Sequence, residues 1–392
     1  NKIVTLALAF KNTGTGLKDV KLLRPGYQSD QQIFTSEFLN SLRPFGAIRF
    51  MDYMKTNNSL LVKWDERPKV TDPQYTQIGG PIERAIDLGN LLDKDIWLCV
   101  PALADDDFVR QLGQLVRERL KPTLHCYVEY SNEVWNGQFK QFHQNEAAAR
   151  ADVAAGDTTL SAGGNDSNVH YWAHKRIARR GVEIKKLLGD DDAQGERAGR
   201  FRVVLASQVG FSPPGGLLKQ QLEYVEKHHG PPAKFFYAVA SAPYFSPGKD
   251  ENDPDKKKWF TQRTDLTADL LCDRLLTRAT TTHVENVKAF HTLARQYNLK
   301  SLSYEGGLDL QQYPTQIDVK TASQYDLRTG QAIENYLTAW YASGGDAMFY
   351  FTLSCKYSKN GYWGLTEDVR DLLTPKYLAA TRVSAKLRDK NP

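Results

Sequence analysis

Two glutamates stand where a side chain could do acid–base or nucleophilic chemistry. Glu133 lies in the segment Y-V-E-Y-S-N-E-V-W-N, and Glu305 lies in S-L-S-Y-E-G-G. Each follows a short apolar and aromatic run, a pattern typical of a buried strand that ends in a loop. Two carboxyl groups placed in this way can cleave a glycosidic bond. One protonates the leaving oxygen, and the other attacks the sugar carbon or activates a water.

The surroundings of Glu133 allow two interpretations. The aromatic neighbours Tyr127, Tyr130 and Trp135 would exclude water from its carboxyl group. Because desolvation raises a carboxyl pKa, Glu133 would then suit a general acid that works near neutral pH. Alternatively, Ser131 or Asn132 caps a helix, and Glu133 lies in its first turn.

Glu305 also has two interpretations. It is followed by Gly306 and Gly307, which permit a sharp turn and leave the carboxylate open to a substrate. Alternatively, Glu305 is an ordinary solvated turn residue. The two glutamates together are more informative than either one alone.

The elements that must position these side chains follow from the hydrophobic pattern. Short, nearly continuous apolar runs alternate with longer amphipathic stretches, as in a parallel sheet covered on both faces. Strands are predicted at 2–10, 46–51, 95–101, 125–131, 202–208, 235–242, 300–304 and 346–353. Helices are predicted at 80–93, 106–120, 168–188, 216–229, 264–297 and 329–343, and long loops at 52–79, 151–167 and 246–263.

This repetition of strand and helix predicts a (β/α)8 barrel that forms a single catalytic domain over residues 1–392. Barrel enzymes present their catalytic groups at the C-terminal ends of the strands. Glu133 lies at the end of the fourth predicted strand and Glu305 at the end of the seventh. The two carboxyl groups should therefore face each other across the barrel.

Further candidates lie in or after other strands. Arg49 is in the second predicted strand, where a buried guanidinium needs a carboxylate partner and lowers its pKa; the alternative is an ordinary barrel salt bridge. Tyr244 follows the sixth strand, Trp363 lies beyond the eighth, and Trp135 lies close to Glu133. Flat aromatic rings such as these can stack on sugar rings, although scattered surface aromatics would look the same.

Composition excludes several other classes of protein. The chain has 392 residues, of which 41% are hydrophobic and 25% charged, an ordinary globular composition. No apolar run approaches the ~18 residues of a membrane span. The net charge of +5 comes without a long Lys/Arg block, which argues against nucleic-acid binding. It fits either an ordinary solvated surface or an anionic polysaccharide substrate.

Motifs for metals and nucleotides are missing from the sequence. The four cysteines are far apart and form no C-x-x-C pair. There is no phosphate-binding G-x-x-x-x-G-K-[ST] motif and no G-x-S-x-G nucleophile motif. We therefore expect neither a metal nor an organic cofactor.

Together, these residues resemble the ordered site of clan A glycoside hydrolases, the retaining (β/α)8 glycosidases. The resemblance implies that Glu133, preceded by Asn132, is the acid/base and that Glu305 is the nucleophile. It also implies that Arg49 and Tyr244 contact the nucleophile. Trp363 would be the floor of the cleaving subsite, although it lies well past its strand.

One feature departs from this pattern. Several clan families have a His at the end of strand three, where this chain has Pro101. No single family is therefore assigned.

The expected function is hydrolysis of β-glycosidic bonds in a poly- or oligosaccharide with retention of configuration. Asn132 would hold the sugar 2-hydroxyl. We expect a monomer that is secreted or periplasmic, because of the expected substrate rather than any visible signal peptide. Two alternatives stay open: a non-catalytic carbohydrate-binding barrel, and a transglycosylase that uses the same residues.

Overall fold

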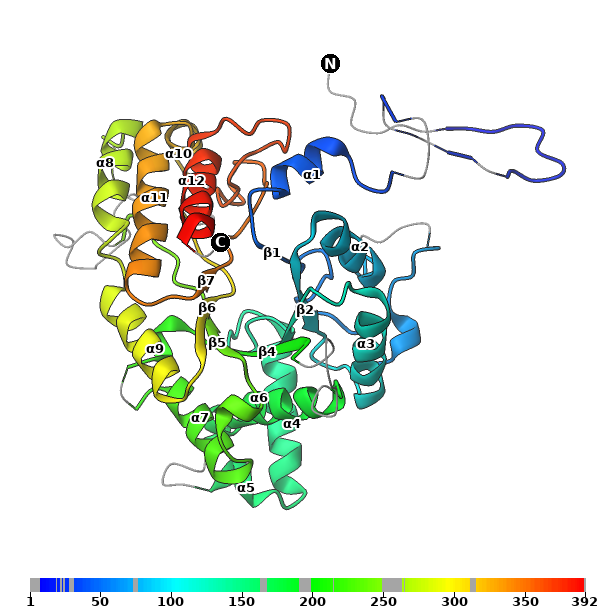
Figure 1. Ribbon diagram of the computed structural model, residues 1–392, viewed down its shortest axis with the longest axis vertical. Helices are drawn as coiled ribbons and strands as arrows, with labels where there is room; N and C mark the ends of the chain where they lie inside the picture. Colours follow the sequence, from blue (N-terminus) through cyan, green and yellow to red (C-terminus); the bar gives the residue numbers. More distant parts are fainter. Residues whose placement is uncertain are drawn as a thin grey trace.

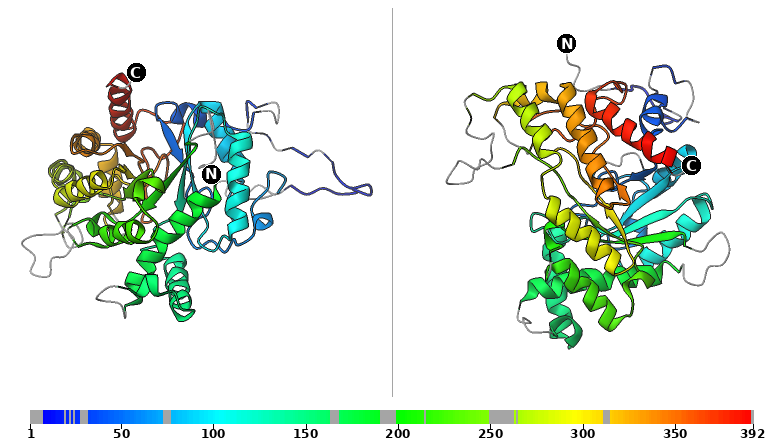
Figure 2. Two further views of the ribbon diagram at one scale, coloured as in Figure 1. Left: turned by 60° about the horizontal axis from the view of Figure 1, so that its bottom comes forward. Right: turned by 60° about the vertical axis from the view of Figure 1, so that its left-hand side comes forward.

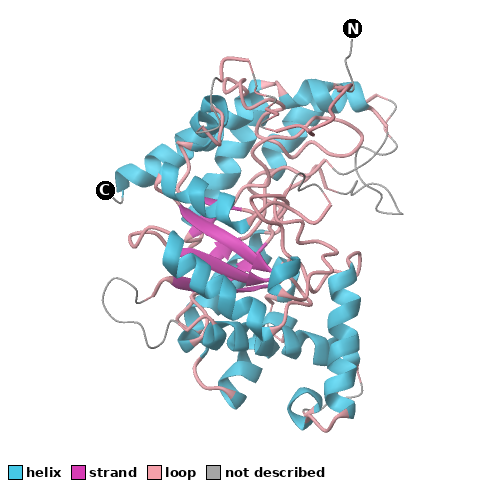
Figure 3. Ribbon diagram, turned by 90° about the vertical axis from the view of Figure 1, so that its right-hand side faces the viewer, coloured by secondary structure: helices cyan, strands magenta, loops and turns pink. Residues whose placement is uncertain are grey.

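The computed structural model describes most of the chain. It covers residues 8–390 except 19, 22, 24, 28–31, 73–76, 163–167, 190–198, 214, 249–262, 264 and 311–314. Within this part, seven parallel strands form one sheet in chain order, β1-β2-β3-β4-β5-β6-β7. The sheet curls, and helices surround it (Figures 1 and 3).

The strands agree with seven of the eight predicted. They are β1 (Ala47–Arg49), β2 (Asp95–Val100), β3 (Cys126–Tyr130), β4 (Phe201–Ala206), β5 (Ala238–Ser241), β6 (Lys300–Ser303) and β7 (Ala347–Met348). Because all seven are parallel, their C-terminal ends meet at one end of the sheet.

Twelve α-helices and three short 3-10 helices cover or connect the strands in the described part of the chain. The first six α-helices are α1 (Ser36–Leu42), α2 (Ile82–Leu92), α3 (Asp106–Arg119), α4 (Lys140–Ala154), α5 (Thr158–Ser161) and α6 (Val169–Leu187). The others are α7 (Leu217–His228), α8 (Ala268–Arg278), α9 (Val284–Gln296), α10 (Ile317–Gln324), α11 (Leu327–Ala342) and α12 (Pro375–Lys390). The 3-10 helices are η1 (Trp64–Glu66), η3 (Val209–Phe211) and η4 (Pro232–Lys234). Figure 2 shows α12, in red, beside α11, in orange.

Two sequence predictions about the strands and helices differ from the described structure or are not confirmed by it. No eighth strand is present in the described residues: residues 8–10 are irregular and exposed, and 1–7 lie outside the described part. The predicted helix 264–297 is instead two helices, α8 and α9, because His283 between them takes a left-handed backbone with φ 56°.

The predicted loops have mixed outcomes. Segment 52–79 holds only η1 within its described residues. Segment 151–167 is partly helical, because α4 runs through Ala154 and α5 follows it. Most of 246–263 lies outside the described residues.

Both faces of the sheet are buried, as the nearly continuous apolar runs predicted. On β2, Ile96, Leu98 and Val100 pack outward with the surrounding helices. Trp97 and Cys99 point the other way, into an inner cluster. That cluster contains Met51, Trp97, Cys99, Tyr127, Val204, Ala238, Ala240, Leu302 and Tyr304. The inner cluster forms the apolar floor below the strand ends.

A cavity of about 700 Å³ lies at the two edge strands of the sheet. Its lining includes β1 and β7 and side chains from α1, α11 and α12. Arg49, Tyr304 and Glu305 also line it. In the described residues β1 and β7 form no ladder with each other, so the closed eight-stranded barrel is not confirmed.

Candidate active site

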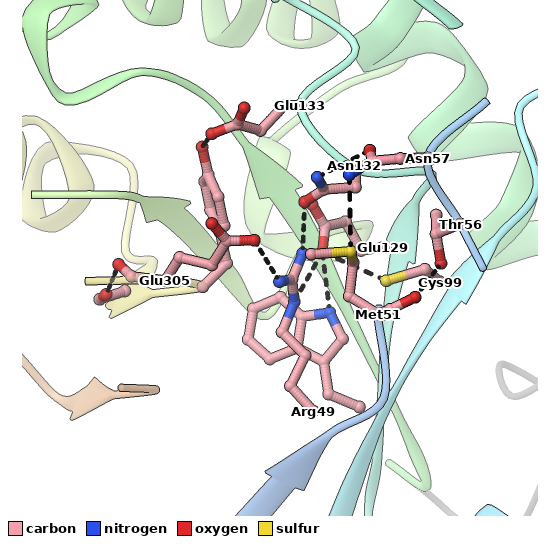
Figure 4. Close-up of polar contacts among 12 residues, drawn as sticks. Arg49, Met51, Thr56, Asn57, Cys99, Glu129, Asn132, Glu133 and Glu305 are labelled. Carbon is pink, nitrogen blue, oxygen red and sulfur yellow. Dashed lines mark hydrogen bonds and ion pairs between the residues drawn. The ribbon is translucent and has the colours of Figure 1, made fainter. Parts of the chain in front are cut away.

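The predicted catalytic and supporting side chains converge on one end of the sheet. Arg49 is the last residue of β1, and Asn132 and Glu133 follow β3. Tyr244 follows β5, and Glu305 follows β6. Figure 4 shows Arg49, Asn132, Glu133 and Glu305 gathered around a common centre, with Glu129 beside Arg49.

Glu305 is buried and is held by a cation and a phenol. The Nη1 of Arg49 donates to its Oε1 at 3.0 Å, and the hydroxyl of Tyr244 donates to its Oε2 at 2.9 Å. Only 7% of Glu305 is exposed, so its interpretation as a solvated turn residue is wrong.

The backbone after Glu305 turns through a glycine. Gly307 has φ 125°, and a Cβ there would lie 2.5 Å from the ring of Tyr350. Only glycine fits this close approach without strain. The chain can therefore leave β6 sharply and present Glu305 at the strand end.

Glu133 is half-buried and is held by neutral donors. The hydroxyl of Tyr304 donates to its Oε1 at 3.0 Å, and the Nδ2 of Asn136 donates to its Oε2 at 2.8 Å. These donors carry no charge, unlike the guanidinium on Glu305. Glu133 can therefore keep a proton more easily than a carboxylate bound to a cation.

The loop that carries Glu133 is tightly bent. Ser131 has φ 56° and Glu133 has φ 43°, values that non-glycine residues rarely adopt. The next α-helix, α4, begins only at Lys140 with Phe139 as its N-cap. The helix-cap interpretation of this segment is therefore wrong.

Arg49 joins three side chains. Besides Glu305, it donates from Nη2 to Oε2 of Glu129 at 2.7 Å and to Oδ1 of Asn132 at 2.8 Å. Its Nε donates to the same oxygen of Glu129 at 3.3 Å. Both interpretations of Arg49 therefore hold: it forms an internal salt bridge to β3, and it binds the candidate nucleophile.

Asn132 is fixed on both sides of its amide. Its Oδ1 accepts from Arg49, and its Nδ2 donates to Oδ1 of Asn57 at 3.0 Å. The Nε2 of Gln141 donates to Asn57 Oδ1 at 2.7 Å and to the Asn132 carbonyl at 2.8 Å. The amide carries two N–H groups, of which one donates to Asn57.

Burial raises the pKa of both candidate catalytic carboxyls. It raises the pKa of Glu305 to about 7, against the opposing effect of Arg49 and with added repulsion from Glu133. Burial also raises the pKa of Glu133, against the hydrogen bonds from Asn136 and Tyr304. Two interacting carboxyls titrate as a pair. The contact with the guanidinium of Arg49 favours the ionised form of Glu305.

Two predicted aromatic residues pack against other rings near the inner cluster. Trp135 is half-buried and edge-on to Phe211, with ring centroids 6.0 Å apart. Trp363 is half-buried and edge-on to Phe351, 5.8 Å away, which follows β7. Stacking of either tryptophan on a sugar stays a prediction.

Sequence reasoning assigned no role to four residues of this network: Glu129, Tyr304, Asn136 and Asn57. Tyr304 directly precedes Glu305, and Asn136 lies in the same loop as Glu133, so proximity in sequence was a usable signal. Asn57 lies in a long loop, and only the fold brings it close to Asn132.

The described residues offer little sign of other chemistry. In that part of the chain, no group of three or more His, Cys, Asp and Glu side chains is arranged to hold a metal ion. All four cysteines are free thiols. Within the same residues, no helix has the length and hydropathy to cross a membrane.

Comparison with known proteins gives no match in sequence and a likeness in fold. No protein-family model matches the chain, and neither does any curated protein. A family 1 β-glucosidase from Thermotoga maritima is similar at 11% identity and a TM-score of 0.45, over 90% of this chain and 85% of that one.

Two further solved structures are similar to the same degree. One is a family 51 arabinofuranosidase from Xanthomonas axonopodis pv. citri, with 12% identity and a TM-score of 0.47 over 88% of this chain and 64% of that one. The other is a broad-specificity endoglucanase from an uncultured bacterium, with 11% identity and a TM-score of 0.45 over 88% and 83%. The chemistry of this chain is inferred from its own side chains.

Proposed function

We propose that this chain is a retaining glycoside hydrolase that cleaves β-glycosidic bonds in a poly- or oligosaccharide. The observation that supports the proposal is the different bonding of its two glutamates, Glu305 and Glu133. Arg49 and Tyr244 hold Glu305, whereas the neutral donors Tyr304 and Asn136 hold Glu133. An ionised nucleophile beside a protonated acid is the arrangement that a double displacement requires.

In the first step, Glu305 attacks the anomeric carbon and forms a glycosyl ester. The bond from that carbon to the leaving oxygen breaks, and the proton of Glu133 moves to the leaving oxygen. Arg49 and Tyr244 aim the Glu305 carboxylate through one hydrogen bond to each of its oxygens. This positioning lowers the entropic part of the barrier.

In the second step, water hydrolyses the ester. Glu133, now ionised, takes a proton from the water while the water oxygen bonds to the anomeric carbon. The ester bond breaks and Glu305 becomes a carboxylate again. Both displacements invert the anomeric carbon, so the overall outcome is retention, for which the carboxyl groups should be ~5–5.5 Å apart.

Substrate binding is assigned to residues around this pair. The second N–H of the Asn132 amide would hold the sugar 2-hydroxyl, and Trp135 and Trp363 would stack on sugar rings. The net charge of +5 is compatible with an anionic polymer. A transglycosylase would use the same groups, with a sugar hydroxyl in place of the water. We also propose that the chain forms one (β/α)8 catalytic domain, acts as a monomer and is exported to reach a polysaccharide.

The test is a depolymerisation screen over neutral and anionic polysaccharides, with products read by size. Wild type is compared with Glu133→Ala and with a control, Glu226→Ala, which makes the same change at an exposed position of α7. We expect cleavage by wild type and the control and loss of cleavage in Glu133→Ala. Polymer binding that is equal in all three proteins, without cleavage by any, would favour the carbohydrate-binding alternative.

A further inference from the structure

A third carboxylate lies inside the sheet beside the candidate catalytic pair. Glu129 is on β3, opposite Cys99 of β2 in the strand register, and only 1% of it is exposed. Figure 4 shows it against Arg49, away from Glu133. The proposed reaction leaves Glu129 without a direct role.

The hydrogen bonds of Glu129 fall on only one of its two oxygens. Oε2 accepts from Arg49 Nη2 at 2.7 Å, from Arg49 Nε at 3.3 Å and from Trp97 Nε1 at 2.9 Å. Oε1 is buried and has no hydrogen-bond partner among the described groups. A glutamine could offer the same acceptor oxygen without placing a charge in this interior. Burying a charge is unfavourable, so a purely structural role would not require the carboxylate.

The charge of Glu129 matters because Arg49 has two carboxylate partners. The ion pairs from Arg49 to Glu129 and to Glu305 measure 2.7 Å and 3.0 Å. When Glu305 becomes a glycosyl ester, it loses its negative charge. Glu133 is ionised at that stage, but the ion pairs of Arg49 in the described structure are with Glu129 and Glu305. Without Glu129, the buried Arg49 would then have no carboxylate in direct contact, an unfavourable state.

We propose that Glu129 is a positioning residue that serves as the permanent counterion of Arg49 through both steps of the reaction. It keeps Arg49 in place when Glu305 is esterified, and it leaves the charge of Glu305 only partly compensated before attack. This inference rests on the proposed glycosidase function.

Glu129→Gln should therefore affect the two steps differently. In this variant Arg49 would pair with Glu305 alone, so the Glu305 carboxylate would be more stabilised and less nucleophilic. Once Glu305 is an ester, the Arg49 guanidinium beside it would have no carboxylate in direct contact. We expect ester formation to slow on the order of tenfold or more, because a preorganised charge opposite the reacting group is lost. Hydrolysis of the ester should not slow, because it restores the partner of Arg49.

The pH profile gives a second readout. Like charges raise one another's pKa, so removing the charge of Glu129 lowers the pKa of Glu305. The acidic limb of kcat/KM, on which Glu305 must lose its proton, should move to lower pH in Glu129→Gln.

The kinetic test uses a panel of 4-nitrophenyl β-glycosides, with stopped-flow separation of the burst from the steady state. The matched control is Trp97→Phe, which removes one hydrogen bond from Glu129 Oε2 and replaces no ionisable side chain. In Glu129→Gln we expect a slower burst and an acidic limb of kcat/KM at lower pH than in wild type. In Trp97→Phe the acidic limb should lie at the same pH as in wild type. Equal slowing of both steps with an unmoved limb would show a structural role and overturn the proposal.

A titration without substrate separates this inference from the proposed function. Carboxyl ¹³C resonances of labelled glutamates are followed with pH in wild type and Glu129→Gln, and the Glu305 signal is assigned by its absence in Glu305→Gln. A lower Glu305 midpoint in the variant supports the counterion role even where wild type cleaves no probe. An unchanged midpoint overturns that role even where wild type is an active glycosidase.

A second pair of variants covers the case in which Glu129→Gln does not fold. Glu129→Asp and Glu129→Asn shorten the side chain equally and differ only in charge. The Glu305 midpoint should be lower in the Asn variant than in the Asp variant, and equal midpoints would reject the proposal.

Discussion

Glu305 and Glu133 are the same kind of side chain, each directly after a strand, yet the protein surrounds them differently. Glu305 forms an ion pair with the guanidinium of Arg49, whereas the described hydrogen bonds to Glu133 come from neutral groups. Burial raises the pKa of both. The type of partner is the ground on which we propose that Glu305 keeps the charge and Glu133 keeps the proton.

The two glutamates also differ in how the backbone delivers them. At Glu305 the unusual backbone is on the following Gly307, with φ 125°. At Glu133 the left-handed conformation, φ 43°, is on the glutamate itself. The sharp turn at Glu305 is thus formed by a residue that tolerates it, whereas Glu133 is held in a strained conformation by its loop.

The largest expected effect is at Glu305. Glu305→Gln keeps the size of the side chain and removes the nucleophilic charge, so turnover should fall by about four orders of magnitude or more. Thermal unfolding should show an intact fold. Substantial turnover by purified Glu305→Gln would remove Glu305 from the role of nucleophile.

Glu133→Ala should have a large effect that depends on the leaving group. Without the acid, cleavage of natural sugar leaving groups should slow by about 10²–10⁴-fold. Aryl glycosides with acidic phenols need little protonation, so their ester formation should slow much less. Rates for a series of substituted phenyl glycosides measure this dependence. Equal slowing for all leaving groups would contradict the acid role.

Arg49→Lys acts mainly on the Glu305 side of the comparison. Lysine keeps the charge but cannot bond Glu129, Asn132 and Glu305 through one planar fork. Arg49 lowers the pKa of Glu305, so weakening their contact should raise that pKa and move the acidic limb of kcat/KM to higher pH. The basic limb, which reports the pKa of Glu133, should move less. A shift confined to the basic limb would contradict the idea that Arg49 acts mainly on Glu305.

The sequence was sufficient to locate both strand ends. Apolar runs that stop at Glu133 and Glu305 mark strand termini, and the order of the strands brings Arg49 and Tyr244 to the same end. The contacts of Arg49 and Tyr244 with Glu305 therefore follow from the repeating pattern of strands and helices. The sharing of Arg49 between Glu129 and Glu305 was not predictable. In a run buried on both faces, periodicity does not show which residues point inward.

Two predicted elements, the strand at 2–10 and the single helix at 264–297, are not confirmed. The run at 2–10 is as apolar as a buried strand, but no local signal says where a strand pairs, and its described residues 8–10 are exposed. The break between α8 and α9 occurs without Gly or Pro, in A-T-T-T-H, where β-branched threonines only weakly disfavour a helix. Local sequence therefore does not predict the break between the two helices.

Tyr304→Phe should have the smallest effect, on the Glu133 side. The Tyr304 hydroxyl donates to Glu133 and lowers its pKa, so its removal should raise that pKa. The basic limb of kcat/KM, where Glu133 must keep its proton, should therefore extend to higher pH. The rate should fall only several-fold, because the loss of one neutral hydrogen bond changes the free energy by ~1 kcal/mol. Tyr130→Phe is the matched control, because its hydroxyl donates to the Ala102 carbonyl instead. A shift of the acidic limb in Tyr304→Phe, or an equal shift in the control, would mean that the two carboxyls are not tuned by separate partners.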